Sequence, residues 1–192
     1  IDGDALLQYA RHTLRHLDES DKYAIALALL IVTGRRTAEI LNGKSKFESV
    51  RNRKYVAIFH GQLKTKRPIP YAIPLLASTE RVREGMRVLR QKQSRTSKRA
   101  LHSNRQVSSR YQSGLRQYAL KRSTFSQMKN IHDLRGIYAY MAYHSISWGQ
   151  SRPTLTMATM RFLGHQDLKD ANVYTTYNVK YTHKINIGPW LM

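Results

Sequence analysis

The chain has 192 residues, and its 33 Lys and Arg residues outnumber its 12 Asp and Glu residues, so the formal net charge is +21. Because 41% of the residues are hydrophobic, the sequence can form a folded core and is not a disordered polycation. It contains no cysteine, which excludes a disulfide scaffold and any zinc site built on thiolates.

The positive charge is concentrated in the middle of the chain. Residues 85–132 contain no Asp or Glu but hold twelve Lys and Arg residues. A solvated face normally mixes both signs, so this stretch indicates an anionic partner. Nucleic acid is favoured because neutralised phosphates release counterions. A membrane surface fits less well, because the stretch lacks the apolar face of an interfacial helix. The longest apolar run, 23–32, is also shorter than the roughly 20 residues that span a bilayer.

Hydrophobic periodicity predicts a helical first half with one hairpin. In chain order we expect helices over 5–17, 21–32 and 37–41. Gly34 is expected to end the second of these helices. The β-rich runs 55–59 and 69–75 flank a polar, basic segment, so they predict an antiparallel hairpin with a basic tip.

The second half predicts further helices, over 79–90, 110–121, 132–143, 154–163 and 170–177. Segment 91–109, rich in Ser, Arg, Lys and Gln, is expected to be mobile until it meets its partner. A C-terminal tail is expected over about 178–192, with an extended conformation from Thr182. The predicted class is mainly α with a small antiparallel β-sheet (α+β), in a single domain spanning 1–192. Because residue 1 is Ile rather than Met, we expect a fragment of a longer protein.

Metal-dependent hydrolysis is poorly supported by the sequence. Two-metal nucleases need several carboxylates that converge on the cations, and the few carboxylates here are clustered near the N-terminus or scattered singly. His12 and His16 form an i,i+4 pair, but no neighbouring acid completes a ligand set, so we expect surface histidines. We therefore predict no metal and no cofactor.

Four other features carry chemistry and follow one another along the chain. They are Thr33-Gly34-Arg35-Arg36-Thr37-Ala38-Glu39, Lys64 at the expected hairpin tip, His132-Asp133-Leu134-Arg135, and Leu163-Gly164-His165 with Tyr174 nine residues beyond the histidine. Each has an ordinary structural explanation by itself, such as capping or solubility, but chance is a poor explanation for the ordered set. On a helix, His132 and Arg135 share a face, and this pair suits a phosphate in a crowded transition state.

In these features the sequence resembles the tyrosine recombinases, the DNA breaking-and-rejoining enzymes related to lambda integrase. That family carries T-G-x-R-x-x-E, a hairpin lysine, H-x-x-R, L-G-H and a nucleophilic tyrosine in this order, and the elements here span 33–174. The resemblance implies the tyrosine recombinase catalytic-domain fold. It assigns to the active site Arg36, Lys64, His132, Arg135, His165 and Tyr174, with Glu39 in support. Arg35 stands where the family usually has an apolar residue.

The residue types imply a mechanism without metal or nucleotide. A phenol, with a reference pKa of about 10, must lose its proton as it attacks, and the phosphate's charge must be neutralised. The resemblance gives the second task to the two arginines and the two histidines, and protonation of the leaving 5′ oxygen to Lys64. The product is a 3′-phosphotyrosyl bond to Tyr174. Tyr177 is the alternative nucleophile, but its spacing from His165 is less favourable.

Within the superfamily, three details are most similar to the telomere resolvases (protelomerases), which form covalently closed hairpin DNA ends. They are the run 41–47 after the T-G-x-R-x-x-E motif, the amino-acid sequence of the hairpin over 59–64 and 71–76, and the long interval from Arg135 to His165. Alternatives are a site-specific integrase or recombinase of the same superfamily, and a non-catalytic DNA-binding relative. An RNA-binding protein and a type IB topoisomerase fit the ordered motifs less well.

The expected partner is double-stranded DNA, bound by a homodimer or a higher assembly and without membrane involvement. Phosphate contacts are predicted for Arg35, Arg90, Lys92, Arg95, Lys98, Arg99 and Arg105. From the family resemblance we expect a cytoplasmic protein that acts at the bacterial nucleoid or is encoded by a phage or plasmid.

Overall fold

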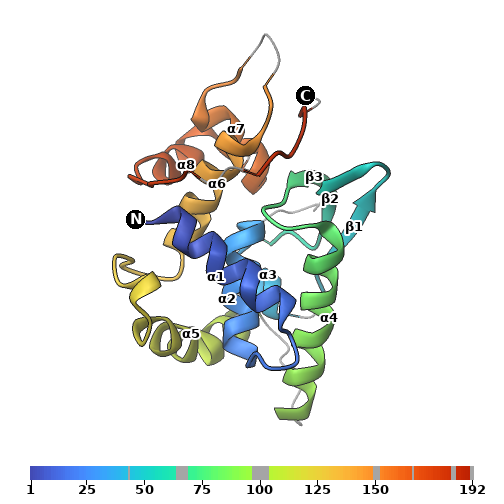
Figure 1. Ribbon diagram of the computed structural model, residues 1–192, viewed down its shortest axis with the longest axis vertical. Helices are drawn as coiled ribbons and strands as arrows, with labels where there is room; N and C mark the ends of the chain where they lie inside the picture. Colours follow the sequence, from blue (N-terminus) through green and yellow to red (C-terminus); the bar gives the residue numbers. More distant parts are fainter. Residues whose placement is uncertain are drawn as a thin grey trace.

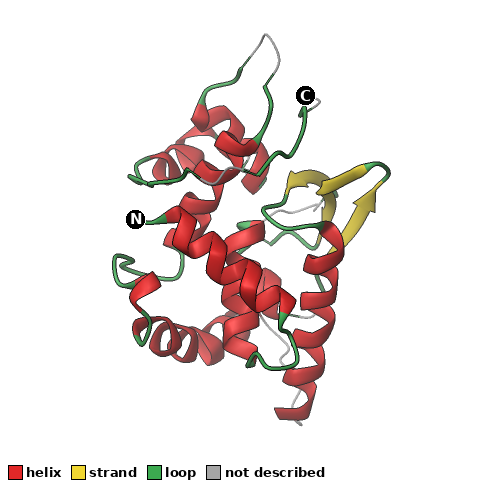
Figure 2. Cartoon of the chain, in the orientation of Figure 1, coloured by secondary structure: helices red, strands yellow, loops and turns green. Residues whose placement is uncertain are grey.

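The computed structural model describes residues 1–42, 44–63, 69–96, 104–148, 152–165, 167–182 and 185–190. Helices dominate it, and one small sheet lies to the side of them (Figure 2), which confirms the predicted fold class. The first half contains α1 (Gly3–Arg15), α2 (Lys22–Thr33), α3 (Thr37–Leu41), β1 (Lys46–Val50), β2 (Arg53–His60) and β3 (Tyr71–Pro74). The second half contains α4 (Thr79–Thr96), α5 (Asn104–Leu120), α6 (Asp133–Ser145), α7 (Leu155–Leu163) and α8 (Leu168–Asn172). Two short 3-10 turns complete it, η1 (Ser123–Phe125) and η2 (Val173–Thr175).

Helix α2 is the centre of the fold. Every residue from Ala24 to Thr33 is buried, as expected of a helix that is apolar on all sides. Its neighbours include α1, α4, α5 and α6, and Figure 1 shows α1 and α4 running along it. The Asp21 carboxylate caps its start by accepting hydrogen bonds from the backbone N–H groups of Tyr23 and Ala24, at 2.7 and 2.9 Å.

The sheet has the strand order β1-β2-β3, with both pairs antiparallel. The β2–β3 pair is the predicted hairpin, and Tyr71 on β3 faces Phe59 on β2 in its register. Strand β1 was not predicted from the sequence. Its run Lys-Phe-Glu-Ser-Val buries only Phe47, so the alternation of apolar and polar residues is too weak to mark a strand without its partner.

The structure differs from the prediction around the basic segment 91–109. Helix α4 continues to Thr96, and α5 already begins at Asn104, so helices extend into this segment from both sides. No Gly or Pro interrupts 91–96, and the buried Val107 and Tyr111 anchor α5. Residues 97–103 lie outside the described part. None of the helices in the described ranges is long and apolar enough to cross a membrane.

The C-terminal residues return to the start of the chain. Lys180 N–H donates to the Ile1 carbonyl at 2.9 Å, and its own carbonyl accepts from Gly3 N–H at 2.8 Å. Farther on, Ile187 N–H donates to the Ser145 carbonyl at 3.0 Å. The segment that follows η2 is therefore fixed to α1 and α6.

The end of α2 requires glycine for two reasons. Gly34 has φ +62°, and a Cβ there would lie 2.0 Å from the Tyr138 ring. We predict that Gly34→Ala lowers the free energy of unfolding by about 2–6 kcal/mol, combining left-handed strain and overpacking of about 1–3 kcal/mol each. Urea unfolding measures the loss. Gly188→Ala is the control, because Gly188 has φ +80° with no atom within 4 Å of its Cβ position, so only the backbone strain applies. Equal losses in the two variants would contradict the packing argument.

Candidate active site

The two neighbouring arginines that follow α2 point in different directions. Arg35 turns inward and is 2% exposed. Its Nε donates to the Thr33 carbonyl at 3.1 Å, and its two terminal nitrogens donate to the Tyr71 hydroxyl and the Phe162 carbonyl. The guanidinium also lies over the Phe59 ring, 4.8 Å from its centroid. Arg35 therefore joins α2 to the sheet and to α7. It is not available as a surface phosphate contact, which corrects the expectation that it binds DNA.

Arg36 stays at the surface of the site and is held by Glu39. The Arg36 Nη1 donates to Glu39 Oε1 at 2.9 Å and to the Leu63 carbonyl at 3.1 Å. The Glu39 side chain is fully buried, and it also accepts from Arg36 N–H at 2.8 Å and from Leu63 N–H at 3.0 Å. The Glu39 carboxylate thus links Arg36 to Leu63, the residue that precedes Lys64. Lys64 itself lies outside the described residues.

The first turn of α6 carries His132 and Arg135. His132 is exposed at the helix start, whereas Arg135 is 2% exposed. The Arg135 Nη1 donates to the Gly34 carbonyl at 2.6 Å, and its Nη2 donates to the Leu163 carbonyl at 2.8 Å and lies 3.4 Å from His165 Nε2. The guanidinium of Arg135 therefore lies where the ends of α2 and α7 meet the start of α6.

Helix α7 ends in the Leu-Gly-His motif. Gly164 is left-handed, with φ +65°, and a Cβ there would collide with Gln62 and Tyr71. The Gln62 side-chain amide donates to the Gly164 carbonyl, so the loop after β2 contacts the motif directly. The next residue, His165, has a side chain that is 7% exposed and whose Nδ1 lies 3.8 Å from the Asp170 carboxylate.

Tyr174 lies in the 3-10 turn η2, beside both histidines. Its hydroxyl is 2.7 Å from His132 Nε2, and its ring centroid is 5.3 Å from that of His165. The Arg135 guanidinium lies 5.7 Å from the centre of the same ring. The structure thus brings Tyr174, His132, Arg135 and His165 together, although 42 residues separate the two ends of the set.

The hydroxyl of Tyr177 points elsewhere. It donates a hydrogen bond to Asp133 Oδ1 at 3.0 Å. Burial, followed by this hydrogen bond, raises the pKa of Tyr177 to about 12. The sequence motifs assign no role to Asp133, Gln62 or Tyr71. Asp133 lies inside the H-x-x-R motif, and Gln62 and Tyr71 lie in the two hairpin runs 59–64 and 71–76.

The site has an excess of positive charge. Burial, followed by the charges of Arg35 and Arg36, lowers the pKa of Arg135 to about 10, so this guanidinium remains protonated at neutral pH. Burial alone would raise the pKa of Glu39, but Arg35, Arg135 and Arg36 outweigh it and hold that pKa below its ordinary value. Among the described residues, Arg35, Arg36 and Arg135 therefore act together on the single carboxylate of Glu39. An anion such as a phosphate would compensate the excess.

The other predicted DNA contacts are placed only in part. Arg90 is half-buried and donates to the Ser45 carbonyl, and Lys92 Nζ donates to the Asp18 carbonyl at 3.1 Å. The side chains of Arg95 and Arg105, and the whole of Lys98 and Arg99, lie outside the described part of the chain. Within the described ranges, no group of three or more His, Asp or Glu side chains could hold a metal ion.

His165 gives the site a measurable pH signature. Burial, followed by the charges of Arg135 and Arg36, lowers the pKa of His165 from 6.5 to about 4. Between these values the unfolded chain binds a proton that the folded protein does not bind. The free energy of unfolding should therefore decrease as the pH falls from 6.5 towards 4. Urea unfolding at several pH values should show a smaller decrease for His165→Gln. If the His165→Gln variant showed the same pH dependence of stability as the wild-type protein, the lowered pKa of His165 would not be its cause.

Comparison with known proteins identifies the family of the chain. Residues 1–177 match the family model described as the telomere resolvase ResT/TelK catalytic domain. The chain is similar to a variant of protelomerase TelA covalently complexed with substrate DNA, with a TM-score of 0.76 and 25% identity over 93% of this chain and 59% of that one. It is also similar to protelomerase TelK complexed with substrate DNA, with a TM-score of 0.73 and 17% identity over 96% of this chain and 39% of that one.

No curated protein matches the sequence. The chain spans less than two thirds of the length of the solved relatives. The family match covers every motif from Thr33 to Tyr174, and the structural similarity extends over nearly the whole chain. The chain therefore belongs to the telomere resolvase catalytic domains, as its ordered arginine, histidine and tyrosine motifs predict.

Proposed function

We propose that this chain is the catalytic domain of a DNA strand transferase that cleaves through Tyr174 and forms covalently closed hairpin ends. The observation that carries the proposal is the 2.7 Å contact between the Tyr174 hydroxyl and His132 Nε2, directly beside the buried Arg135. An imidazole at this distance is within reach to accept the phenol's proton. The family match and the covalent DNA complex of TelA support the same chemistry.

The proposed step is an attack of the Tyr174 oxygen on a backbone phosphorus. The tyrosine O–P bond forms, the bond from phosphorus to the 5′ oxygen breaks, and the phenol's proton passes to His132. Arg36, Arg135 and His165 stabilise the charge on the non-bridging oxygens. Arg135 can do so because its carbonyl partners hold it in place before the substrate arrives. The product is a 3′-phosphotyrosine and a free 5′-hydroxyl.

Rejoining reverses the step with a different 5′-hydroxyl. If that hydroxyl belongs to the complementary strand of the same DNA duplex end, the two strands are joined and the product is a hairpin end. Two cleavages at paired positions are then needed, so we propose a dimer or a higher assembly on double-stranded DNA. For the place of action we propose the cytoplasm, at bacterial, phage or plasmid DNA.

The direct test is covalent trapping on a nicked duplex target without added metal. We expect the wild-type protein to form a 3′-linked adduct and Tyr174→Phe to form none, because a phenyl ring has no nucleophilic oxygen. A denaturing gel separates hairpin ends from strand-exchange products. If no adduct forms with a full-length protein and its target, the catalytic proposal is wrong. Strand-exchange products without hairpins would instead indicate a recombinase.

Lys64 is proposed to protonate the leaving 5′ oxygen. General-acid catalysis contributes typically about 10²–10⁴-fold, so we expect Lys64→Ala to slow cleavage at least about 100-fold. A substrate whose bridging 5′ oxygen is replaced by sulfur releases a thiolate that needs no proton, and it should restore most of the rate. Lys66→Ala, two residues on, is the matched control. A loss that the sulfur substrate does not reduce would exclude this role.

A further inference from the structure

Residues 173–177, called here the nucleophile segment, contain a second tyrosine that contacts the start of α6, where His132 lies. Tyr177 follows Tyr174 by three residues, and its hydroxyl donates to Asp133 Oδ1 at 3.0 Å. Asp133 is the residue next to His132, and it is 6% exposed. This hydrogen bond therefore links the residue next to His132 to a residue three positions after Tyr174, close to the contact between Tyr174 and His132.

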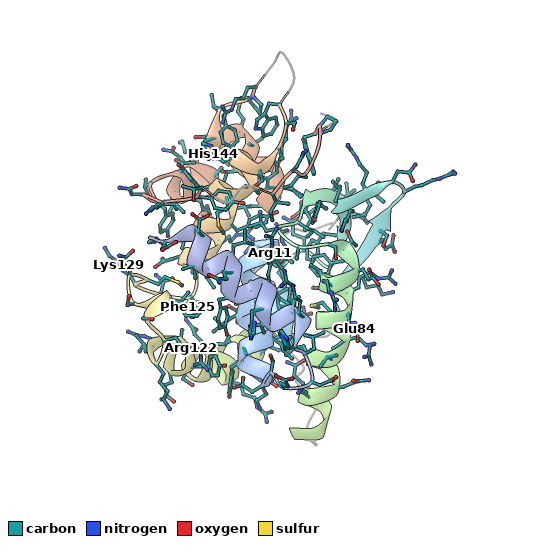
Figure 3. All side chains as sticks on the ribbon, in the orientation of Figure 1. Arg11, Glu84, Arg122, Phe125, Lys129 and His144 are labelled. Carbon is teal, nitrogen blue, oxygen red and sulfur yellow. The ribbon has the colours of Figure 1, made fainter. Side chains whose placement is uncertain are left out.

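The same carboxylate also fixes the turn that leads into α6. Asp133 Oδ2 accepts hydrogen bonds from the backbone N–H groups of Lys129 and Asn130, at 2.8 and 3.0 Å. Figure 3 shows Lys129 on this connection between α5 and α6. With one oxygen on the turn and the other on Tyr177, Asp133 links the backbone that presents His132 to the segment that presents Tyr174.

The ring of Tyr177 packs directly on α6. A Cβ added at Gly136 would lie 2.3 Å from the Tyr177 ring and 3.0 Å from the Tyr174 carbonyl oxygen. Only glycine leaves room for this close approach, so the residue after the H-x-x-R motif seats the nucleophile segment against the first turn of the helix.

The nucleophile segment has few other anchors of its own. The turn η2 contains no buried residue, and Val173 is 66% exposed. Ala171 is buried before the turn and Val179 after it. Between these two anchors, η2 packs against α6, α7 and α8, and the Tyr174 ring lies beside His165. The hydrogen-bond contacts of the two tyrosine hydroxyls are both with the start of α6.

We propose that the Asp133–Tyr177 contact is a clamp that holds the Tyr174 oxygen in the position for attack. Asp133 and Tyr177 are positioning residues in this proposal, which rests on the proposed function. A nucleophile displaced by about 1 Å can cost about 10²-fold in rate. The raised pKa of Tyr177 agrees with a hydroxyl that stays protonated and donates.

The test measures single-turnover adduct formation at saturating protein on a nicked duplex. We expect Tyr177→Phe to slow adduct formation about 10–100-fold, while the affinity for the duplex changes less than about twofold. The adduct should remain on Tyr174. The sulfur substrate should not restore the rate, because the defect lies in the nucleophile and not in the leaving group.

A matched control separates positioning from loss of stability. Tyr143→Phe makes the same change on α6, the helix that Tyr177 contacts, and removes the hydrogen bond from the Tyr143 hydroxyl to the Pro153 carbonyl, at 2.8 Å. We expect it to cleave at the wild-type rate. Asp133→Asn should slow cleavage as well, and adding Tyr177→Phe to it should cause little further loss, because the two residues act through one contact.

Four outcomes would overturn the clamp. The first is a Tyr177→Phe variant that forms adduct at the wild-type rate, and the second is a loss no larger than that of Tyr143→Phe. The third is independent, multiplying losses in the double variant. The fourth is an adduct that survives in Tyr174→Phe and disappears in Tyr177→Phe, which would make Tyr177 the nucleophile. If the wild-type protein forms no adduct, the proposed function itself fails, and that result is distinct from all four.

Discussion

The arrangement of the site depends on one buried cation. The Arg135 guanidinium is 2% exposed, and it donates to the carbonyls of Gly34 and Leu163. Leu163 is the last residue of α7 and Gly34 is the residue that caps α2, so both carbonyls lie at helix C-termini, where each helix carries its partial negative charge. A buried charge is costly unless it is paired and hydrogen-bonded, so both helix ends must lie where Arg135 can reach them. The left-handed glycines Gly34 and Gly164 end the two helices there.

The buried Arg135 adds to the excess of positive charge in the site. Arg35 and Arg36 lie near enough to lower the pKa of Arg135, and Glu39 is the buried carboxylate that offsets them. A folded domain tolerates such repulsion when a ligand relieves it, and strain of this kind is expected at functional sites. The excess charge also explains why His165 remains neutral, because the neighbouring arginines add to the effect of burial. A neutral imidazole can donate a hydrogen bond to a phosphate oxygen without adding to the repulsion.

The sequence predicts the motif residues and most helices because these depend on local spacing. His132 and Arg135 share the first turn of α6, and the buried α2 follows from its apolar run. The inward turn of Arg35 could not be predicted, because its partners Tyr71 and Phe162 lie 36 and 127 residues away. The motif distinguishes Arg36 from Arg35, but it does not reveal the partners that bury the Arg35 side chain. For the same reason the sequence did not reveal β1, whose stability comes from pairing with β2, nor the bond between Asp133 and Tyr177.

The first turn of α6 combines these constraints in consecutive residues. His132 faces the Tyr174 hydroxyl, Asp133 holds Tyr177, Arg135 binds the ends of α2 and α7, and Gly136 admits the Tyr177 ring. Leu134, between them, is 2% exposed and faces the core. A shift of α6 would therefore disturb the contacts of His132, Tyr174 and the buried Arg135 together. Because the core fixes Leu134, the helix cannot rotate to improve one contact without weakening the others. The tyrosine is consequently positioned by its own chain, before any DNA is bound.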